Sequence, residues 1–293
     1  GLVVRKIEDD GYLRFERVGG VPEKILLGQS ISVITKNGKE LSGIIGTKSH
    51  HATQPDEKYK VPSYKDLYID LGLRTASEVL TSGIDIGSPI VYKPSAEIIG
   101  DEKIIGTSVD DRAGCAVLLE VARQINSRTA GPEINIVFTV QEEFNLRGAL
   151  PVAQKIKPEI AIQIDLLLAS DTPDMRDFGE IKLGEGPGIS VFSFHGRGTL
   201  NGVIPHPVLV KHFEQAASKE NINLQKSAHI GALTDLSYVQ LVEDGVASLD
   251  VGFPIRYSHT AQEMCDLKDL VGLTKLLTSA LNSIPKDINL IRD

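Results

Sequence analysis

Cysteine is scarce in this sequence, and membrane-spanning segments are absent from it. The only cysteines among the 293 residues are Cys115 and Cys265, which lie far apart and outside any CxxC or zinc-ribbon spacing. Two isolated thiols are typical of a reduced cytosolic protein, with one disulfide as the alternative. No apolar run reaches the roughly 20 residues that a transmembrane helix needs, and the opening segment GLVVRKI is no signal peptide. We therefore predict a cytoplasmic protein with no membrane partner.

The sequence also lacks an excess of basic residues. Lys and Arg number 31 against 39 Asp and Glu, which gives a net charge of −8. Such a balance disfavours nucleic acids and anionic membranes as partners, because both reward a basic surface. The glycine-rich stretches GRG (196–198) and GEGPG (184–188) lack the spacing of a P-loop or a dinucleotide fingerprint. A divalent cation, which acidic side chains attract, stays compatible with this composition.

Short β-strands dominate the first third of the chain. Alternating apolar and polar residues predict strands that turn residues separate, with hairpin signals at residues 9–11 and at the Asn-Gly pair within residues 36–40. A polar loop is expected at residues 48–64, and a helix at residues 75–83. We expect a β-rich domain over residues 8–93.

The pattern changes to alternating helices and strands from about residue 98. The expected elements are a helix at 110–125, strands at 134–140 and 159–166, and helices at 206–221 and 268–284. This order predicts an α/β domain built on a mainly parallel sheet. The α/β domain is expected to comprise residues 1–7 and 94–293.

Acidic residues follow several of these strands. The buried strand expected at 134–140 ends in the adjacent acids Glu142 and Glu143, and the strand at 159–166 contains Asp165 near its end. Adjacent carboxylates repel and are costly to bury unpaired. Asp110 and Asp111 begin a helix, and His259 follows a late apolar run. Because ligands bind beyond the carboxyl ends of strands in α/β sheets, these side chains are candidates for a divalent metal site.

A metal ion gives the paired glutamates separate roles. One can ligate the metal while its neighbour activates a metal-bound water, which is the basis of metal-assisted hydrolysis. The structural alternative for each acid is a helix cap or a salt bridge, as for Asp110 or Asp111 at a helix start. His50 and His51 also lie in the polar loop, where a solvated role is the alternative to metal binding.

Several motifs, taken together, resemble the tetrahedral and glutamyl aminopeptidases, hydrolases with a two-metal site. The matching strings, which fall in order along nearly the whole chain, are SVDDRAGCAVLLEV, VQEEFNLRGA, IQIDLLLASDTP, KLGEGPGI and GFPIRYSHT. GYLRFERVGG, GIIGTKSHH and DLYIDLG resemble the family's inserted dimerisation barrel. The resemblance implies a three-layer α/β/α catalytic domain of the zinc-exopeptidase type, with residues 8–93 as that inserted barrel.

The resemblance also assigns roles to individual residues. Asp110 corresponds to the carboxylate that bridges two metals, and the Asp110–Asp111 peptide is expected to be cis. Glu142 corresponds to the general base, and Glu143 and His259 to ligands of one metal. Asp165 corresponds to a ligand of the other metal. Zinc or cobalt are the expected ions, and dimers that assemble into a larger shell are the expected oligomer.

Two features depart from the family pattern. Family members carry a His-x-Asp-Glu motif just before the residues that open this chain, so we expect a segment with that motif to precede Gly1 in the intact protein; without it, activity of this chain is in question. Residues 230–236, IGALTDL, replace the family's Gly-Gly-Thr-Asp run, with Ala232 and Leu233 in place of glycines. This replacement alters the expected shape of the nearby substrate pocket, so no specificity residue is assigned.

The predicted function is a metal-dependent aminopeptidase that removes N-terminal residues from peptides. The alternatives are a deacylase or other amide hydrolase on the same site, and a non-catalytic assembly subunit. Metal content separates the last alternative from the enzymes, and a panel of peptide substrates separates the two hydrolases.

Overall fold

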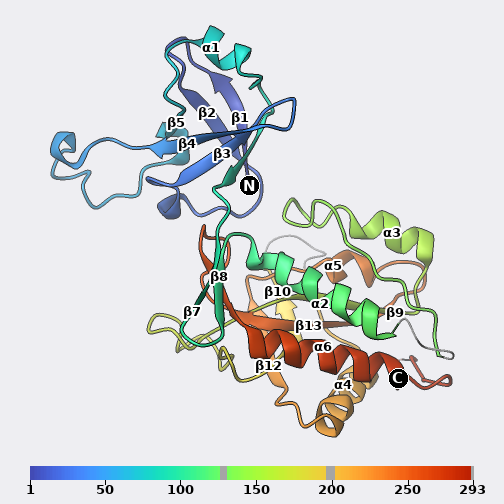
Figure 1. Cartoon of the computed structure of the whole chain (residues 1–293). Coiled ribbons are helices and arrows are strands. Elements are labelled where there is room, and N and C mark those ends of the chain that lie inside the picture. Colours follow the sequence, from blue (N-terminus) through green and yellow to red (C-terminus); the bar gives the residue numbers. More distant parts are fainter. Residues whose placement is uncertain (126–130, 196–201, 292–293) are drawn as a thin grey trace. The chain divides into compact units, whose positions relative to one another are not determined.

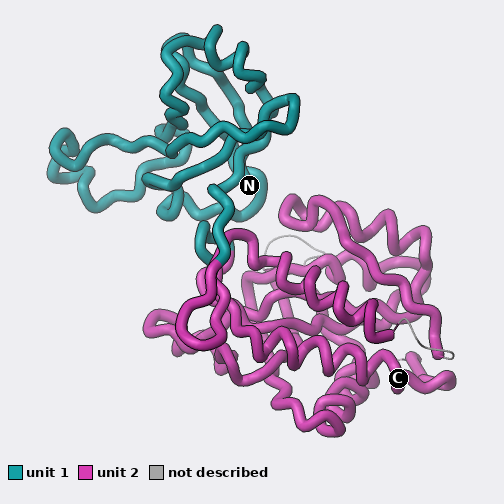
Figure 2. Tube along the Cα trace, viewed as in Figure 1, with its two compact units in different colours: residues 1–96, 259–262 teal, residues 97–258, 263–293 magenta. Residues whose placement is uncertain are grey.

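The computed structural model describes residues 1–125, 131–195 and 202–291, which form two compact units. Figure 2 colours unit 1, residues 1–96 and 259–262, apart from unit 2, residues 97–258 and 263–293. Among the described residues, no helix has both the length and the apolar character that crossing a bilayer requires. The GRG stretch of the sequence analysis lies outside the described residues.

Unit 1 is a closed six-stranded barrel with the strand order β1-β2-β5-β4-β3-β6 (Figure 1). Its strands are β1 (Leu2–Ile7), β2 (Leu13–Arg17), β3 (Ser30–Ile34), β4 (Glu40–Gly46), β5 (Tyr68–Asp70) and β6 (Pro89–Tyr92). A short helix, α1 (Ala76–Thr81), and three 3-10 turns at Glu23–Ile25, His50–Ala52 and Tyr64–Asp66 complete the unit. Closure leaves no unpaired strand edge, which is how small β-structures avoid edge-to-edge association.

Alternating side chains fill the barrel, as the sequence pattern predicts. Leu13 and Phe15 of β2 are at most 1% exposed and pack in the barrel core with Ile31 and Ile69. The turn between β1 and β2 requires Gly11, whose φ of +88° suits glycine and whose Cβ position would lie 2.7 Å from a backbone oxygen. Residues 1–7, which the sequence pattern places in the α/β domain, instead contain β1, which pairs with β2 and β6 inside the barrel.

Unit 2 contains a mixed five-stranded sheet. The strands are β9 (Ile160–Leu168), β10 (Gly188–Phe194), β11 (Gly202–Val203), β12 (Gln225–Ile230) and β13 (Ala247–Ile255). The β9–β13 and β10–β12 pairs are parallel, and β10 pairs antiparallel with both β13 and β11. The sheet is therefore parallel in two of these four strand pairs, and it differs from the expected mainly parallel sheet in that β10 runs against β13. A smaller sheet has the order β14 (Glu263–Asp266), β8 (Lys103–Gly106), β7 (Ala96–Ile99).

Three amphipathic helices pack on one face of the larger sheet (Figure 1). They are α2 (Val109–Ile125), α4 (Pro207–Lys219) and α6 (Leu267–Asn282), close to the predicted ranges. Their apolar residues share a core with every second residue of β13 from Ala247 to Ile255. The intervening residues of β13, Ser248, Asp250 and Gly252, therefore point to the opposite face.

A smaller cluster lies beside α5 (Leu236–Val239) and α3 (Ala149–Ile156). It contains Leu236, Val239 and Val246, together with Ala149 and Ala153 of α3. The short α5 contacts β9, β11 and β13, so this segment and the loop before it lie close to the polar side of β13.

The strand predicted at residues 134–140 is wrong. This segment has no strand assignment, and Phe138 and Val140 are 49% and 68% exposed. A strand needs a partner that completes its ladder of hydrogen bonds, and among the described residues none pairs with this segment. Apolar, β-branched composition alone therefore gave the wrong assignment here.

Candidate functional site

The start of α2 places two aspartates in different environments. Asp110 and Asp111 have non-helical backbone angles, and the peptide between them is cis, as the resemblance implies. Asp111 Oδ1 accepts a hydrogen bond from Gly114 N at 3.0 Å, which is a helix-capping contact. Asp110 N donates to the buried Glu263 Oε2 at 3.0 Å. The capping role that the sequence allowed for either residue therefore belongs to Asp111.

The paired glutamates lie in a turn rather than at a strand end. Gln141 has a φ of +58°, and the turn closes through hydrogen bonds from Leu146 N to Glu142 O (2.8 Å) and from Phe144 N to Gln141 O (3.3 Å). The left-handed conformation is sparsely populated by glutamine and clusters at functional sites. Glu142 and Glu143 therefore lie in a turn and not in a strand with alternating side chains.

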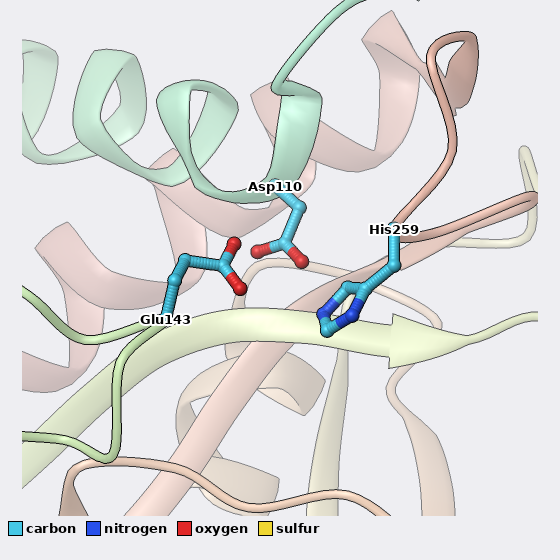
Figure 3. A group of neighbouring side chains, drawn as sticks. All are labelled: Asp110, Glu143 and His259. Atoms are coloured by element: carbon cyan, nitrogen blue, oxygen red, sulfur yellow. The ribbon is translucent and has the colours of Figure 1, made fainter. Parts of the chain in front are cut away.

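Three of the four predicted metal ligands come together. Asp110, Glu143 and His259 each offer one ligand atom, and these atoms all lie within 4.8 Å of one another (Figure 3). Tyr257 and His259 both have left-handed backbone angles, with φ of +63° and +61°. His259 Nδ1 lies 2.9 Å from Gly20 O. Because a carbonyl oxygen only accepts, Nδ1 carries the proton and Nε2 is the nitrogen suited to a metal.

The fourth predicted ligand, Asp165, is not a member of this three-residue group. It lies on β9 opposite Gly252, and its Oδ1 accepts a hydrogen bond from Leu166 N at 2.7 Å. Burial raises the pKa of Asp165 well above its usual value, and the charges of Asp110, Asp111 and Glu142 raise it further. Of the three-residue group, Asp110 is therefore the member whose charge acts on Asp165.

The acids of the site repel one another strongly. Burial, followed by the charges of Glu143, Asp235 and Asp110, raises the pKa of Glu142 to about 8. Burial and the charge of Asp110 likewise raise the pKa of Asp111 to about 8. Such shifts mark sites where burial and like charges are concentrated. A bound cation would reverse them, because it favours the ionised carboxylates.

The donor set of the three-residue group suits a divalent ion of the zinc type. Two carboxylate oxygens and one imidazole nitrogen are ligands that zinc accepts, and catalytic zinc sites commonly use three protein ligands with a fourth position for water or substrate. Asp110 is half-buried, whereas Glu143 and His259 are exposed. The residues present therefore fit such an ion on the side of Asp110, Glu143 and His259.

Three residues near the site were not predicted from the sequence. Asp235 accepts a hydrogen bond from Thr139 Oγ1 at 2.9 Å and contributes to the pKa of Glu142. Arg256 makes two hydrogen bonds to Asp171, at 2.8 and 2.6 Å, and so fixes the end of β13 that precedes His259. Asp250 is 3% exposed in the middle of β13. A single acid inside an apolar run such as VASLDVGF is the signal that marks Asp250.

Comparison with known proteins defines the class. Residues 1–276 match the model of the M42 glutamyl aminopeptidase family. SgcX of Escherichia coli (strain K12) is 38% identical over 279 residues, which is 95% of this chain and 74% of that protein. The lysyl aminopeptidase of Pyrococcus furiosus (strain ATCC 43587 / DSM 3638 / JCM 8422 / Vc1) is 30% identical over 97% of this chain and 79% of its own.

Solved structures of peptidases have a similar fold. The TET1 peptidase of Pyrococcus horikoshii, which can assemble into a tetrahedron or a large octahedral shell, superposes with a TM-score of 0.85 at 29% identity and covers 97% of this chain and 81% of its own. The fold and the matches define an aminopeptidase, a hydrolase of the peptidase class. The chain belongs to the M42 glutamyl aminopeptidase family, so the resemblance drawn from its motifs is confirmed.

Proposed function

We propose that this aminopeptidase is metal-dependent and uses two divalent ions, zinc or cobalt. The observation that carries the proposal is the grouping of Asp110, Glu143 and His259 within 4.8 Å, with the glutamate neighbour Glu142 in the same turn. Asp110 would bridge both ions, Glu143 and His259 would complete one site, and Asp165 would contribute to the other. The mutual repulsion of these acids supports the proposal, because cations offset it.

Glu142 is proposed as the general base. Ions held by these residues would polarise the scissile carbonyl and lower the pKa of the attacking water toward neutrality. Glu142 accepts the proton that this water loses and passes it to the nitrogen of the leaving peptide. Its raised pKa in the absence of a cation follows from burial and from Glu143, so ion binding also restores its ionised form.

Architecture and assembly complete the proposal. Unit 2 is proposed as a three-layer α/β/α catalytic domain, and residues 8–93 of the barrel as an inserted dimerisation domain. Dimers that assemble into a closed shell are supported by the tetrahedral and octahedral assemblies of the TET1 peptidase. A cytoplasmic location is supported by Cys115 and Cys265, which form no disulfide.

The test uses the intact protein with zinc or cobalt and a panel of aminoacyl-p-nitroanilides. Glu142→Gln should bind metal as the wild type does and lose about 10²–10⁴ in kcat, the usual contribution of a general base. The matched control is Glu159→Gln, an exposed glutamate six residues before Asp165, or roughly 20 Å along the strand.

Each outcome decides a separate part of the proposal. Metal-dependent cleavage that Glu142→Gln abolishes and Glu159→Gln retains supports it. Two bound ions with cleavage only of N-acylated amines would favour the deacylase. Absence of stoichiometric metal in the intact protein would refute metal dependence.

A further inference from the structure

A small cavity, lined by both apolar and polar residues, lies against the middle of the five-stranded sheet in unit 2. Its volume is about 30 Å³, and the polar residues that line it include Ser190, Ser193, Ser227, His229, Thr234 and Asp250. We call it the Asp250 cavity. Since about 10–15 Å³ holds one water, the cavity has room for at least one group of the size of water or ammonium. Asp165 also lines it, so the cavity adjoins a residue of the proposed catalytic site.

Asp250, which lines this cavity, has one buried carboxylate oxygen without a hydrogen-bond partner. The side chain is buried on β13, and its Oδ1 accepts a hydrogen bond from Thr234 Oγ1 at 2.7 Å. Its Oδ2 is buried without a hydrogen-bond partner. A buried carboxylate oxygen without a partner is costly, and natural structures retain such groups chiefly where they serve a purpose.

The register of the sheet places further polar groups beside Asp250. Asp250 lies opposite Ser190 of β10, and Ser190 lies opposite Ser227 of β12. These three residues therefore form a polar row on one face of three adjacent strands. The Oγ atom of Ser193, which is 5% exposed, is likewise buried without a partner. Two residues that line the cavity, Asp250 and Ser193, thus each have a buried polar atom without a hydrogen-bond partner.

The charges around the cavity favour a cation. None of its described lining residues is a lysine or an arginine. Burial lowers the pKa of His229, which keeps that ring neutral. The remaining polar lining consists of carboxyl groups and hydroxyls, all of which can accept hydrogen bonds from an ammonium group. An anion would meet Asp165 and Asp250 and would be repelled.

We propose that the Asp250 cavity is a specificity subsite that binds the ε-ammonium group of a lysine at the N-terminus of the substrate. The proposal deepens the proposed aminopeptidase function and rests on it. The compact ammonium head fits a cavity of this size, whereas the planar guanidinium of arginine, with five donors, is larger. Ala232 also lines the cavity, and its methyl group narrows the site where the family pattern has glycine.

Binding to small amides tests the subsite without turnover. Lysinamide and norleucinamide share the same α-amine and the same four-carbon stem, but only lysinamide carries the ε-ammonium. By calorimetry we expect lysinamide to bind the wild type about 10–100-fold more tightly, as charged hydrogen bonds of this kind allow. In Asp250→Asn this ratio should fall to about 1, and in Ser193→Ala it should fall several-fold.

Turnover provides a second readout and separates this proposal from the proposed function. The ratio of kcat/KM for lysyl to leucyl p-nitroanilide should fall at least tenfold in Asp250→Asn. The matched control, Asp244→Asn, changes an exposed aspartate of the same unit and should keep the ratio. If no p-nitroanilide is cleaved while lysinamide still binds preferentially through Asp250, the subsite stands and the proposed chemistry fails.

Three results would overturn the subsite. The first is an unchanged lysyl-to-leucyl ratio in Asp250→Asn. The second is an equal loss for all substrates, which would mean that Asp250 binds the α-amine. The third is stabilisation of the wild type by ammonium or potassium chloride, absent with tetramethylammonium chloride and without competition from lysinamide, which would mean that the cavity holds a free monovalent cation. Circular dichroism of each variant verifies that it folds.

Discussion

Three carboxyl groups in unit 2, of the buried Asp250 and Asp269 and the half-buried Asp171, differ in how their oxygens are satisfied. Asp269 accepts hydrogen bonds from Gly184 N and Gly186 N, at 2.8 and 2.7 Å. These amides belong to the glycine-rich stretch 184–188, which thus binds a side chain of the protein itself. Asp171 is satisfied by Arg256. Asp250, by contrast, has one oxygen without a hydrogen-bond partner. Substitution of Asp269 or Asp171 therefore removes hydrogen bonds to both carboxylate oxygens, whereas substitution of Asp250 removes a hydrogen bond to only one.

The first prediction concerns the pH dependence that Asp250 imposes on stability. Burial and the charge of Asp235 raise its pKa from 3.8 to about 7. An acid whose pKa is higher in the folded chain destabilises the fold as pH rises between the two values. Asp250→Asn removes this penalty, so we expect the variant and the wild type to be equally stable below pH 4. Above pH 7 the variant should be more stable by a few kcal/mol, at most about 4.

Urea unfolding at pH 4 and pH 8 measures this difference. Asp244→Asn, on an exposed aspartate, is the control and should follow the wild type at both pH values. Parallel pH dependence of Asp250→Asn and the wild type would show that Asp250 does not titrate in this range.

The second prediction concerns Arg256, whose guanidinium binds both oxygens of Asp171. Lysine keeps the charge but cannot form this two-pronged contact. We expect Arg256→Lys to lower the free energy of unfolding by about 1–3 kcal/mol. It should also reduce kcat, because Arg256 precedes Tyr257 and His259. Thermal unfolding and steady-state kinetics test both effects, and a variant with wild-type values in both would contradict this role.

At the scale of elements, sequence patterns identified the helices better than the strands. Spaced apolar residues located α2, α4 and α6 because one face of each helix must be buried. The segment 134–140 has the composition of a strand, yet strand formation depends on a pairing partner from another part of the chain. The direction of β10 against β13 is equally invisible in the sequence, since both orientations suit the same residues.

The part of the candidate site that could be predicted consists of residues that lie within the family's sequence motifs. Asp110, Glu143 and His259 were named from the sequence, and the structure places them together. Asp235 and Asp250 were not named, because their positions depend on the fold of a loop and on strand register. Each is an acid with apolar residues close by in the sequence. The sequence alone does not show whether such an acid is buried or lies in an exposed loop.

The third prediction tests the packing of α4. Phe213 is 0% exposed and belongs to the main core of unit 2. Removing a fully buried phenyl ring costs the transfer free energy and leaves a cavity, so Phe213→Ala should destabilise the protein by about 3–5 kcal/mol. Gln215→Ala, at an exposed position of the same helix, should change stability by less than about 0.5 kcal/mol. A loss below 1 kcal/mol for Phe213→Ala would contradict the packing described for α4.

Among the described residues, each unit has a main hydrophobic core of its own. The barrel closes on itself and pairs all six of its strands. The larger sheet of unit 2 is open, and among the described strands β9 pairs only with β13. Strand β9, which carries Asp165, therefore lies at an edge of this sheet.

The fourth prediction links metal to the stability of the intact protein. A ligand that binds only the folded state stabilises it, by about 2.7 kcal/mol when its concentration is 100 times Kd. Zinc or cobalt should therefore raise Tm, and a chelator should reverse the rise. Glu143→Gln should weaken this response, because it removes a proposed ligand, while Glu159→Gln should respond as the wild type. A metal-independent Tm would argue against the proposed site.

The exposed apolar side chains of residues 138–144 have a practical consequence for handling this polypeptide. Phe138, Val140 and Phe144 are 49%, 68% and 44% exposed. Exposed apolar side chains associate with those of other copies and with partly unfolded chains. Preparations of this chain should therefore bind fluorescent apolar dyes, lose solubility as concentration and temperature rise, and give better yields when expressed slowly in the cold or together with chaperones.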